Sequence, residues 1–184
     1  MSFLKRFAKW MSKNYPDVPV NMSEWTHMQG GRDKGMDSAL VTANVMYEDL
    51  SVLNVISWQH WIAVSEVNYC DGLIYINLDD KTFEMTKRYY VTGNFSKYVP
   101  TGSVRVDAAC NDPELRLLAF KYDGGCAVIV INSTKKEKEL SLPEQYSAVK
   151  SAVTDDNNNL CEYDIADPGY IKITPRSVTT IILR

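Results

Sequence analysis

The sequence predicts two structural units: an α/β unit with a parallel sheet or barrel over residues 1–100, and an antiparallel β-sandwich over residues 101–184. Three observations lead to this prediction. Helical and short apolar segments alternate before residue 100, and eight short strands separated by turn-forming residues follow it. The segment 100–102 (Pro-Thr-Gly) marks the change between the two patterns.

The first unit begins with an amphipathic helix, expected at residues 1–14, where apolar side chains recur at helical spacing until Pro16 ends the pattern. A short extended run at 18–22 and a polar loop with three glycines follow. The remaining elements expected here are helices at 36–53 and 81–98, a short strand at 55–58, and a short strand or extended loop at 73–78. Helix and strand therefore alternate, as in folds built from βα units.

The second unit contains only strands in this interpretation, because short apolar runs are separated by Gly, Asn, Asp, Ser and Pro clusters. The expected strands are 103–108, 115–122, 127–132, 138–142, 146–154, 160–163, 170–174 and 177–183.

Composition limits the function classes. The chain has 184 residues, 45% of them hydrophobic and 23% charged, with a formal net charge of −3. This balance lacks the basic footprint of a nucleic-acid binder, and no apolar run approaches the ~20 residues of a membrane span. We therefore expect neither nucleic acid nor a membrane as partner.

The first 19 residues carry lysines within the apolar segment and do not resemble a secretory signal peptide. The four cysteines form no Cys-x-x-Cys pair, so free thiols are expected.

The first candidate site residue is Glu24, which lies with Trp25 at the end of a short apolar strand. In βα folds, catalytic side chains gather at the carboxyl ends of the strands. A carboxylate beside an indole suits a sugar site, because an aromatic face packs on the sugar ring. A solvated glutamate at a strand end is the alternative.

The second candidate segment is 57–61 (Ser-Trp-Gln-His-Trp), where Trp58, His60 and Trp61 offer stacking faces and a hydrogen-bonding ring. Burial of the tryptophans in the core is the alternative. His27 and His60 are the two histidines, and three ligands including Glu24 would suffice for zinc. The sequence has no His-Glu-x-x-His motif, so we expect no metal and no other cofactor.

Four stretches resemble family 30 of the glycoside hydrolases, and within it the endo-β-1,6-galactanase-like members. Residues 22–25 (Met-Ser-Glu-Trp) resemble the motif around the nucleophile on the seventh barrel strand. Residues 57–61 resemble the aromatic eighth strand, with His60 where tyrosine is usual. Residues 71–74 with 86–102 resemble the last barrel helix and its exit. Residues 127–132 resemble a core strand of the family's β-sandwich.

The resemblance implies a partial (β/α)8 barrel, comprising the last two βα units, followed by an antiparallel β-sandwich. It also implies a retaining mechanism with two carboxylates ~5–5.5 Å apart. Glu24 matches the nucleophile, and Trp25, His27, Trp58, His60 and Trp61 are then expected to bind an oligo- or polysaccharide. The family's acid/base lies in an Asn-Glu-Pro motif, and this chain contains no Asn-Glu pair.

Two functional interpretations follow. In the first, the chain is part of a retaining hydrolase of β-linked glycans (galactan-, glucan- or xylan-like) and is inactive alone because it lacks the acid/base. In the second, it is a non-catalytic carbohydrate-binding or interaction module. The family comparison implies a secreted or periplasmic parent enzyme, although no signal peptide is apparent here. We also expect self-association through the incomplete barrel surface, because strand edges there lack partners.

Overall fold

The first unit of the computed structural model is a βαβ arrangement, as the alternation predicts; residues 3–143 and 146–184 are described. Its elements are α1 (Phe3–Asn14), β1 (Asn21–Trp25), α2 (Met36–Glu48), the π-helical turn η1 (Asp49–Leu53) and β2 (Ser57–His60). Strands β1 and β2 run parallel, with Asn21 opposite Ser57 and Trp25 opposite His60. The described residues contain these two barrel-like strands and no closed barrel.

A three-stranded sheet follows β2, in the order β3 (Val64–Ser65), β4 (Ile74–Asn77), β5 (Thr82–Met85). The expected helix at 81–98 is wrong at its start, because Thr82–Met85 pairs antiparallel with β4. Helix α3 spans Lys87–Ser96, and Thr86 is its N-cap, with Oγ1 accepting from the Tyr89 backbone N–H at 3.3 Å.

All eight strands expected after residue 100 are present. They are β6 (Val104–Val106), β7 (Leu115–Tyr122), β8 (Gly125–Asn132), β9 (Lys138–Leu140), β10 (Ala148–Thr154), β11 (Cys161–Asp164), β12 (Ile171–Ile173) and β13 (Ser177–Leu183). Six form an antiparallel sheet in the order β11-β10-β13-β8-β7-β6, while β12 pairs with β9 in a smaller sheet. The division at residue 100/101 remains a prediction.

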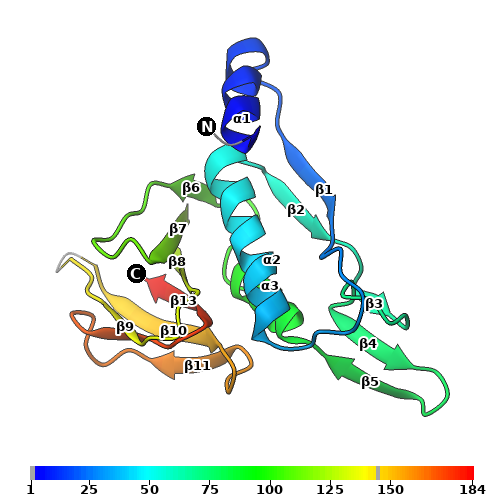
Figure 1. Cartoon of the computed structure of the whole chain (residues 1–184). Helices are drawn as coiled ribbons and strands as arrows, with labels where there is room; N and C mark the ends of the chain where they lie inside the picture. Colours follow the sequence, from blue (N-terminus) through cyan, green and yellow to red (C-terminus); the bar gives the residue numbers. More distant parts are fainter. Residues whose placement is uncertain (1–2, 144–145) are drawn as a thin grey trace.

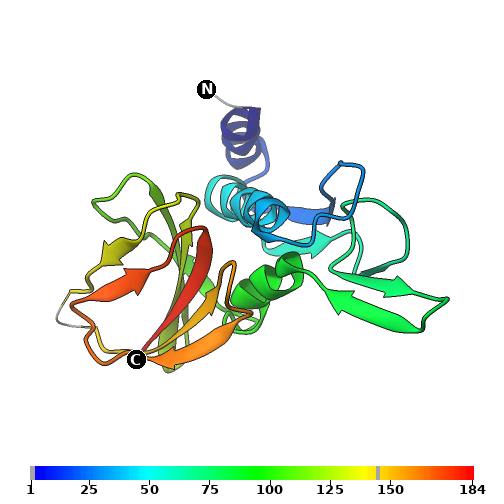
Figure 2. The ribbon, with the colours of Figure 1, turned by 60° about the horizontal axis from the view of Figure 1, so that its bottom comes forward.

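Both faces of the six-stranded sheet are covered (Figures 1 and 2). Helices α2 and α3 pack on one face, where Ile129 and Ile131 of β8 join Phe95 of α3 in one core cluster. Val128 and Val130 point to the opposite face and join a second cluster with residues of β9 and β12. Alternation of side chains along β8 therefore explains its nearly continuous apolar sequence.

Helix α3 connects the two units through its buried face. Asn94 donates from Nδ2 to the Ala152 carbonyl at 2.9 Å and to Thr180 Oγ1 at 3.1 Å. Phe95 lies in the core cluster beside the sheet.

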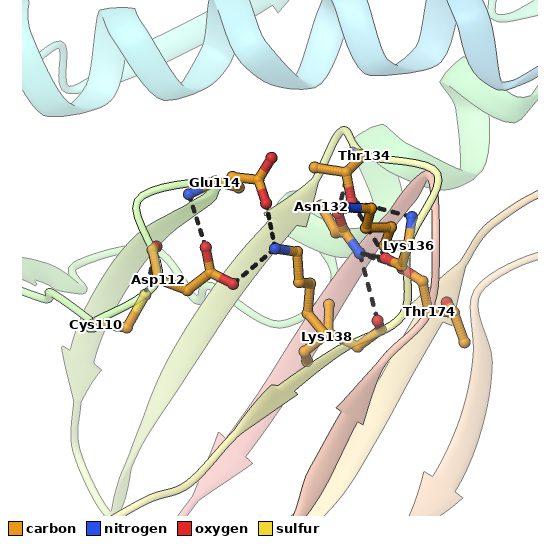
Figure 3. A network of polar contacts seen from close by, with 9 residues as sticks. Cys110, Asp112, Glu114, Asn132, Thr134, Lys136, Lys138 and Thr174 are labelled. Carbon is orange, nitrogen blue, oxygen red and sulfur yellow. Dashed lines mark hydrogen bonds and ion pairs between the residues drawn. The ribbon is translucent and has the colours of Figure 1, made fainter.

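Polar contacts close one end of the sandwich (Figure 3). Asn132 Nδ2 donates at 2.9 Å to the carbonyls of both Lys136 and Thr174, which joins the ends of β8 and β12. Lys138 on β9 contacts Asp112 at 2.9 Å and also pairs with Glu114. Side chains thus tie the smaller sheet to the larger one.

Helix α1 contacts η1 and lies at the end of α2 (Figure 1), and none of its described residues is buried. Among the described helices, we find none with the length and apolar character needed to cross a membrane. The four cysteines are free, as expected from their spacing.

Candidate functional site

The candidate site lies where β1 and β2 end side by side (Figure 1). The Trp61 backbone N–H donates to the Trp25 carbonyl at 2.8 Å, which continues the strand pairing past His60. The chain then turns into the loop between β2 and β3. Residues following both strands therefore leave the sheet at one edge, the arrangement that places side chains of different strands in one site.

Four of the six predicted site residues form one aromatic cluster. The ring centroid of Trp25 lies 5.7 Å from Trp58, 6.0 Å from His60 and 6.4 Å from His27. Trp58 and His60 are 6.2 Å apart. These separations are typical of packed aromatic rings.

Glu24 lies on the open face of β1. A bulge gives β1 one more residue than β2 between the pairs Met22–Trp58 and Trp25–His60. Ser23 and Glu24 occupy the bulge and are exposed, while Met22 and Trp25 are half-buried. Glu24 is therefore accessible and directed away from the packed face.

Trp58 packs toward the helices. Its indole N–H donates to Asp49 Oδ2 at 2.9 Å, and its ring packs against the core cluster of the large sheet. Burial raises the pKa of Asp49, and the bond from the indole partly offsets that effect. Alternation along β2 places Trp58 and His60 on one face, but the sequence does not say which face the helices cover.

The packed face opens onto a groove of about 560 Å³. Trp58 and His60 line it together with residues of η1, α3 and the segment 99–105. Trp61, just beyond β2, is outside its lining and 50% exposed. Trp61 is therefore free to meet a ligand at the strand ends.

His60 is held by the loop between β3 and β4. Its Nε2 lies 2.7 Å from the Asp71 carbonyl, so Nε2 carries the proton and Nδ1 is left as an acceptor. Nδ1 is buried and has no partner among the described residues. Burial lowers the pKa of His60, because a charged ring would be poorly solvated there.

Arg88 is a site residue that the sequence analysis missed. Its side chain is fully buried and donates to the carbonyls of Asp33 and Gly72, each at 2.6 Å. It also donates to the Ser38 and Tyr75 hydroxyls and to Cys70 Sγ, the last at 3.1 Å. Arg88 thereby joins the loop after β1 to the loop between β3 and β4.

His27 is tied to this arginine through a thiol, since its Nδ1 lies 3.5 Å from Cys70 Sγ. The aromatic cluster and the buried arginine thus form one continuous set of contacts. A buried arginine is a weak sequence signal, because Lys87-Arg88 at a helix start is usually solvated.

Two other carboxylates near the strand ends differ in accessibility. Asp71 is buried, and its Oδ2 accepts from Ser65 Oγ at 3.2 Å. Glu66 is exposed in the loop after β3. Within the described ranges, no three His, Cys, Asp or Glu side chains gather in a way that would hold a metal ion.

Comparisons with known proteins bear on this region directly. Residues 20–75, which run from β1 through β3 to the start of β4, match the model of O-glycosyl hydrolase family 30. The chain is 27% identical to the lysosomal acid glucosylceramidase of Mus musculus over 126 residues, which is 62% of this chain and 23% of that enzyme.

Solved structures share the fold. A conserved exported protein of Bacteroides fragilis matches with a TM-score of 0.84 at 20% identity, over 97% of this chain and 42% of that protein. A family 30 xylanase of Clostridium acetobutylicum matches with a TM-score of 0.72 at 20% identity, over 90% of this chain and 42% of the enzyme. The chain therefore spans less than half the length of these proteins.

The fold combines two parallel strands and their helices with an antiparallel six-stranded sheet, and it matches a portion of the solved family 30 structures. The chain is related to family 30 of the O-glycosyl hydrolases through residues 20–75, the segment with Glu24 and the aromatic cluster. The resemblance read from the sequence is thus confirmed at the level of the family relation.

Proposed function

We propose that this chain carries the nucleophile-bearing part of a retaining glycoside hydrolase that acts on β-linked glycans, with Glu24 as the nucleophile. The observation that carries the proposal is the placement of Glu24. It is exposed at the carboxyl end of a parallel strand, within the segment that matches the family model. Catalytic carboxylates occupy that end of the strands in βα barrels.

The chemistry assigned to Glu24 is attack by its carboxylate on the anomeric carbon. The glycosidic C–O bond breaks, and a covalent glycosyl ester forms, which water later hydrolyses. An acid must protonate the leaving oxygen in the first step. Asp71 is buried, so it is a poor candidate for that acid. We therefore propose that the 184 residues alone turn over unactivated glycans at a negligible rate, since loss of such an acid typically costs ~10²–10⁴-fold.

The aromatic residues have two roles in this proposal. Trp25, His27 and Trp61 surround the strand ends and contact the sugar. Trp58 and His60 support Trp25 from the helix side, through ring contacts of 5.7 Å and 6.0 Å. Galactan-, glucan- and xylan-like chains are all candidate substrates, and a secreted or periplasmic parent enzyme fits the exported relative.

A dinitrophenyl fluoroglycoside tests the nucleophile without needing the acid. Dinitrophenolate leaves unprotonated, and the fluorine slows hydrolysis of the ester, so the sugar stays on the attacking residue. We expect galacto-, gluco- or xylo-configured reagents to add one glycosyl group to the chain, located on Glu24 by peptide mass spectrometry. Glu24→Gln should not be labelled, whereas Glu66→Gln, changed at another exposed glutamate, should be. Labelling elsewhere, or by none of the three reagents, contradicts the proposal.

The second candidate function is a non-catalytic carbohydrate-binding module. It is favoured by the absence of any Asn-Glu pair for an acid/base in the sequence. In that case, the wild type and Glu24→Gln bind oligosaccharides equally, and the two proteins react in the same way with the dinitrophenyl fluoroglycosides.

Self-association is a further part of the proposal. Within the described residues, β1 and β2 pair only with each other, and the groove of about 560 Å³ lies beside β2. Unpaired strand edges attract other strands. We expect sedimentation velocity to show concentration-dependent dimers, and a monomer at all concentrations contradicts this.

A further inference from the structure

A second groove lies on the β-sandwich, away from β1 and β2. It has a volume of about 380 Å³ and is lined by residues of β10, β11 and β12 and the loop between the last two. Tyr163 on β11 contributes to its lining from the larger sheet, and Tyr170, next to β12, contributes from the smaller one. Its volume falls within the range of small-ligand pockets, roughly 300–1,000 Å³.

The two tyrosine rings are exposed but held in place. Their exposed fractions are 49% for Tyr163 and 48% for Tyr170. Tyr163 donates its hydroxyl to Asn158 Oδ1 at 2.7 Å, and Tyr170 donates to Glu139 Oε1 at 2.8 Å. Because each hydroxyl already donates within the protein, each side chain is held in place and can offer its aromatic surface to a ligand. Fixed, half-exposed rings lose little entropy when a ligand packs on them.

The polar residues of the groove suit hydroxyl groups. Asp164 and Asp167 are exposed acceptors beside the rings, and Lys172 is an exposed donor. The three side chains sum to a charge of −1, and Lys172 is further neutralised by Glu137 at 3.2 Å. An anionic ligand would therefore be repelled, while a neutral polyhydroxylated ligand could bond to all three.

We propose that this groove binds a neutral glycan chain, with sugar rings packed on Tyr163 and Tyr170 and hydroxyls bonded to Asp164, Asp167 and Lys172. This surface is separate from the one that carries Glu24, because it lies on β10–β12 and the other lies on β1. It goes beyond the proposed hydrolase function: it would hold a polysaccharide on the sandwich, whether or not the chain cleaves it.

Isothermal titration of the whole chain with neutral cello-, xylo- and galacto-oligosaccharides tests the proposal. We expect at least one series to bind, and Tyr163→Ala and Tyr170→Ala each to weaken that binding about tenfold or more. Tyr163→Phe should bind like the wild type if it remains folded by circular dichroism, because the ring is retained. Tyr15→Ala is the matched control, since Tyr15 is 50% exposed on the chain segment after α1, and it should change nothing.

Several outcomes overturn the proposal. They are absence of binding in all three neutral series, equal binding of an acidic oligogalacturonide, and binding that survives both alanine substitutions. Glu24→Gln separates this inference from the hydrolase proposal. It should abolish covalent labelling and leave this binding intact, so either idea can fail without the other. Loss of binding in Glu24→Gln would place the glycan at β1 instead.

Discussion

Strands β8 and β1 differ in how far they are buried and in how many neighbouring strands they pair with. β8 has a neighbour on each edge and is covered on both faces, so its residues from Ala127 to Asn132 are all buried. β1 has β2 as its one neighbour in the described structure and exposes Asn21, Ser23 and Glu24. The buried strand supplies packing energy, while the exposed strand presents a carboxylate. The site strand must therefore be positioned by contacts other than its own packing.

Those contacts are the aromatic cluster and Arg88. The cluster packs one face of β1 and β2 toward the helices. Arg88 joins the loop after β1 to the loop between β3 and β4. We expect substitutions in β8 to affect global unfolding, and substitutions around Arg88 to affect mainly the loops.

The largest effect expected is for Ile129→Ala in β8. Ile129 is completely buried between the sheet and the helices, and a truncated isoleucine in such a place typically costs ~2–5 kcal/mol. Ile56→Ala, beside β2 and 69% exposed, is the matched control and should change the free energy of unfolding by less than ~0.5 kcal/mol. Urea denaturation measures both, and similar values for the two would remove the contrast.

The next effect concerns Arg88→Leu. Leucine fills part of the space but leaves the buried acceptors around Arg88 unpaired, and such groups cost ~1–3 kcal/mol each when unsatisfied. We expect hydrogen exchange to speed up in the loops at 26–35 and 61–73 while β7, β8 and β13 stay protected. Arg6→Leu, at an exposed arginine of α1, is the control. Uniform loss of protection over the whole chain would show that Arg88 supports the core rather than the site.

A smaller effect is expected from His60 and depends on pH. Burial lowers the pKa of His60 in the folded state below its ordinary value of 6.5. The unfolded chain therefore takes up the proton first, and stability present above pH 6.5 is lost as the pH falls below it. His60→Gln should flatten this part of the stability curve, measured as urea midpoints above and below pH 6.5. An unchanged slope in His60→Gln would contradict the burial argument.

The smallest effect is expected at Glu162, where α3 meets the edge strand β11. Lys97 and Tyr98 lower the pKa of Glu162 from 4.5 to about 2, through hydrogen bonds of 2.9 Å and 2.8 Å. Stability from these contacts is full above pH 4.5 and is lost as the pH falls toward 2. The group is on the surface, so the change is small. Melting temperatures of the wild type and Glu162→Gln should differ above pH 4.5 and converge near pH 2; a constant difference would contradict this.

The strands after residue 100 were predictable because their signal is local. Apolar runs bounded by turn residues suffice there, and β7 and β13 have the expected bounds, 115–122 and 177–183. The start of segment 81–98 was mispredicted because its apolar spacing also fits a helix, whereas Thr82–Met85 forms a hairpin with the preceding strand β4. The capping residue Thr86 was the available signal for the true start.

The candidate site was predictable in its residues but not in its geometry. The motif identified Glu24 and its aromatic neighbours, and the parallel pairing of β1 and β2 brings four of these rings together. The face of β2 on which Trp58 lies depends on where α2 and η1 pack. The hydrogen bond from the Trp58 indole to Asp49 shows that this is the helix side, but the sequence alone does not place Asp49 beside Trp58. Arg88 was missed for the same reason, since its acceptors come from separate loops.

The bulge in β1 also has a consequence for how this segment can vary among related proteins. Its extra residue separates the packed positions Met22 and Trp25 by three residues instead of two. Deleting one residue between them would turn either Trp25 outward or the preceding carboxylate inward, whereas replacing Ser23 would leave both in place. Substitutions at this position should therefore accumulate over evolutionary time, while insertions and deletions should be eliminated.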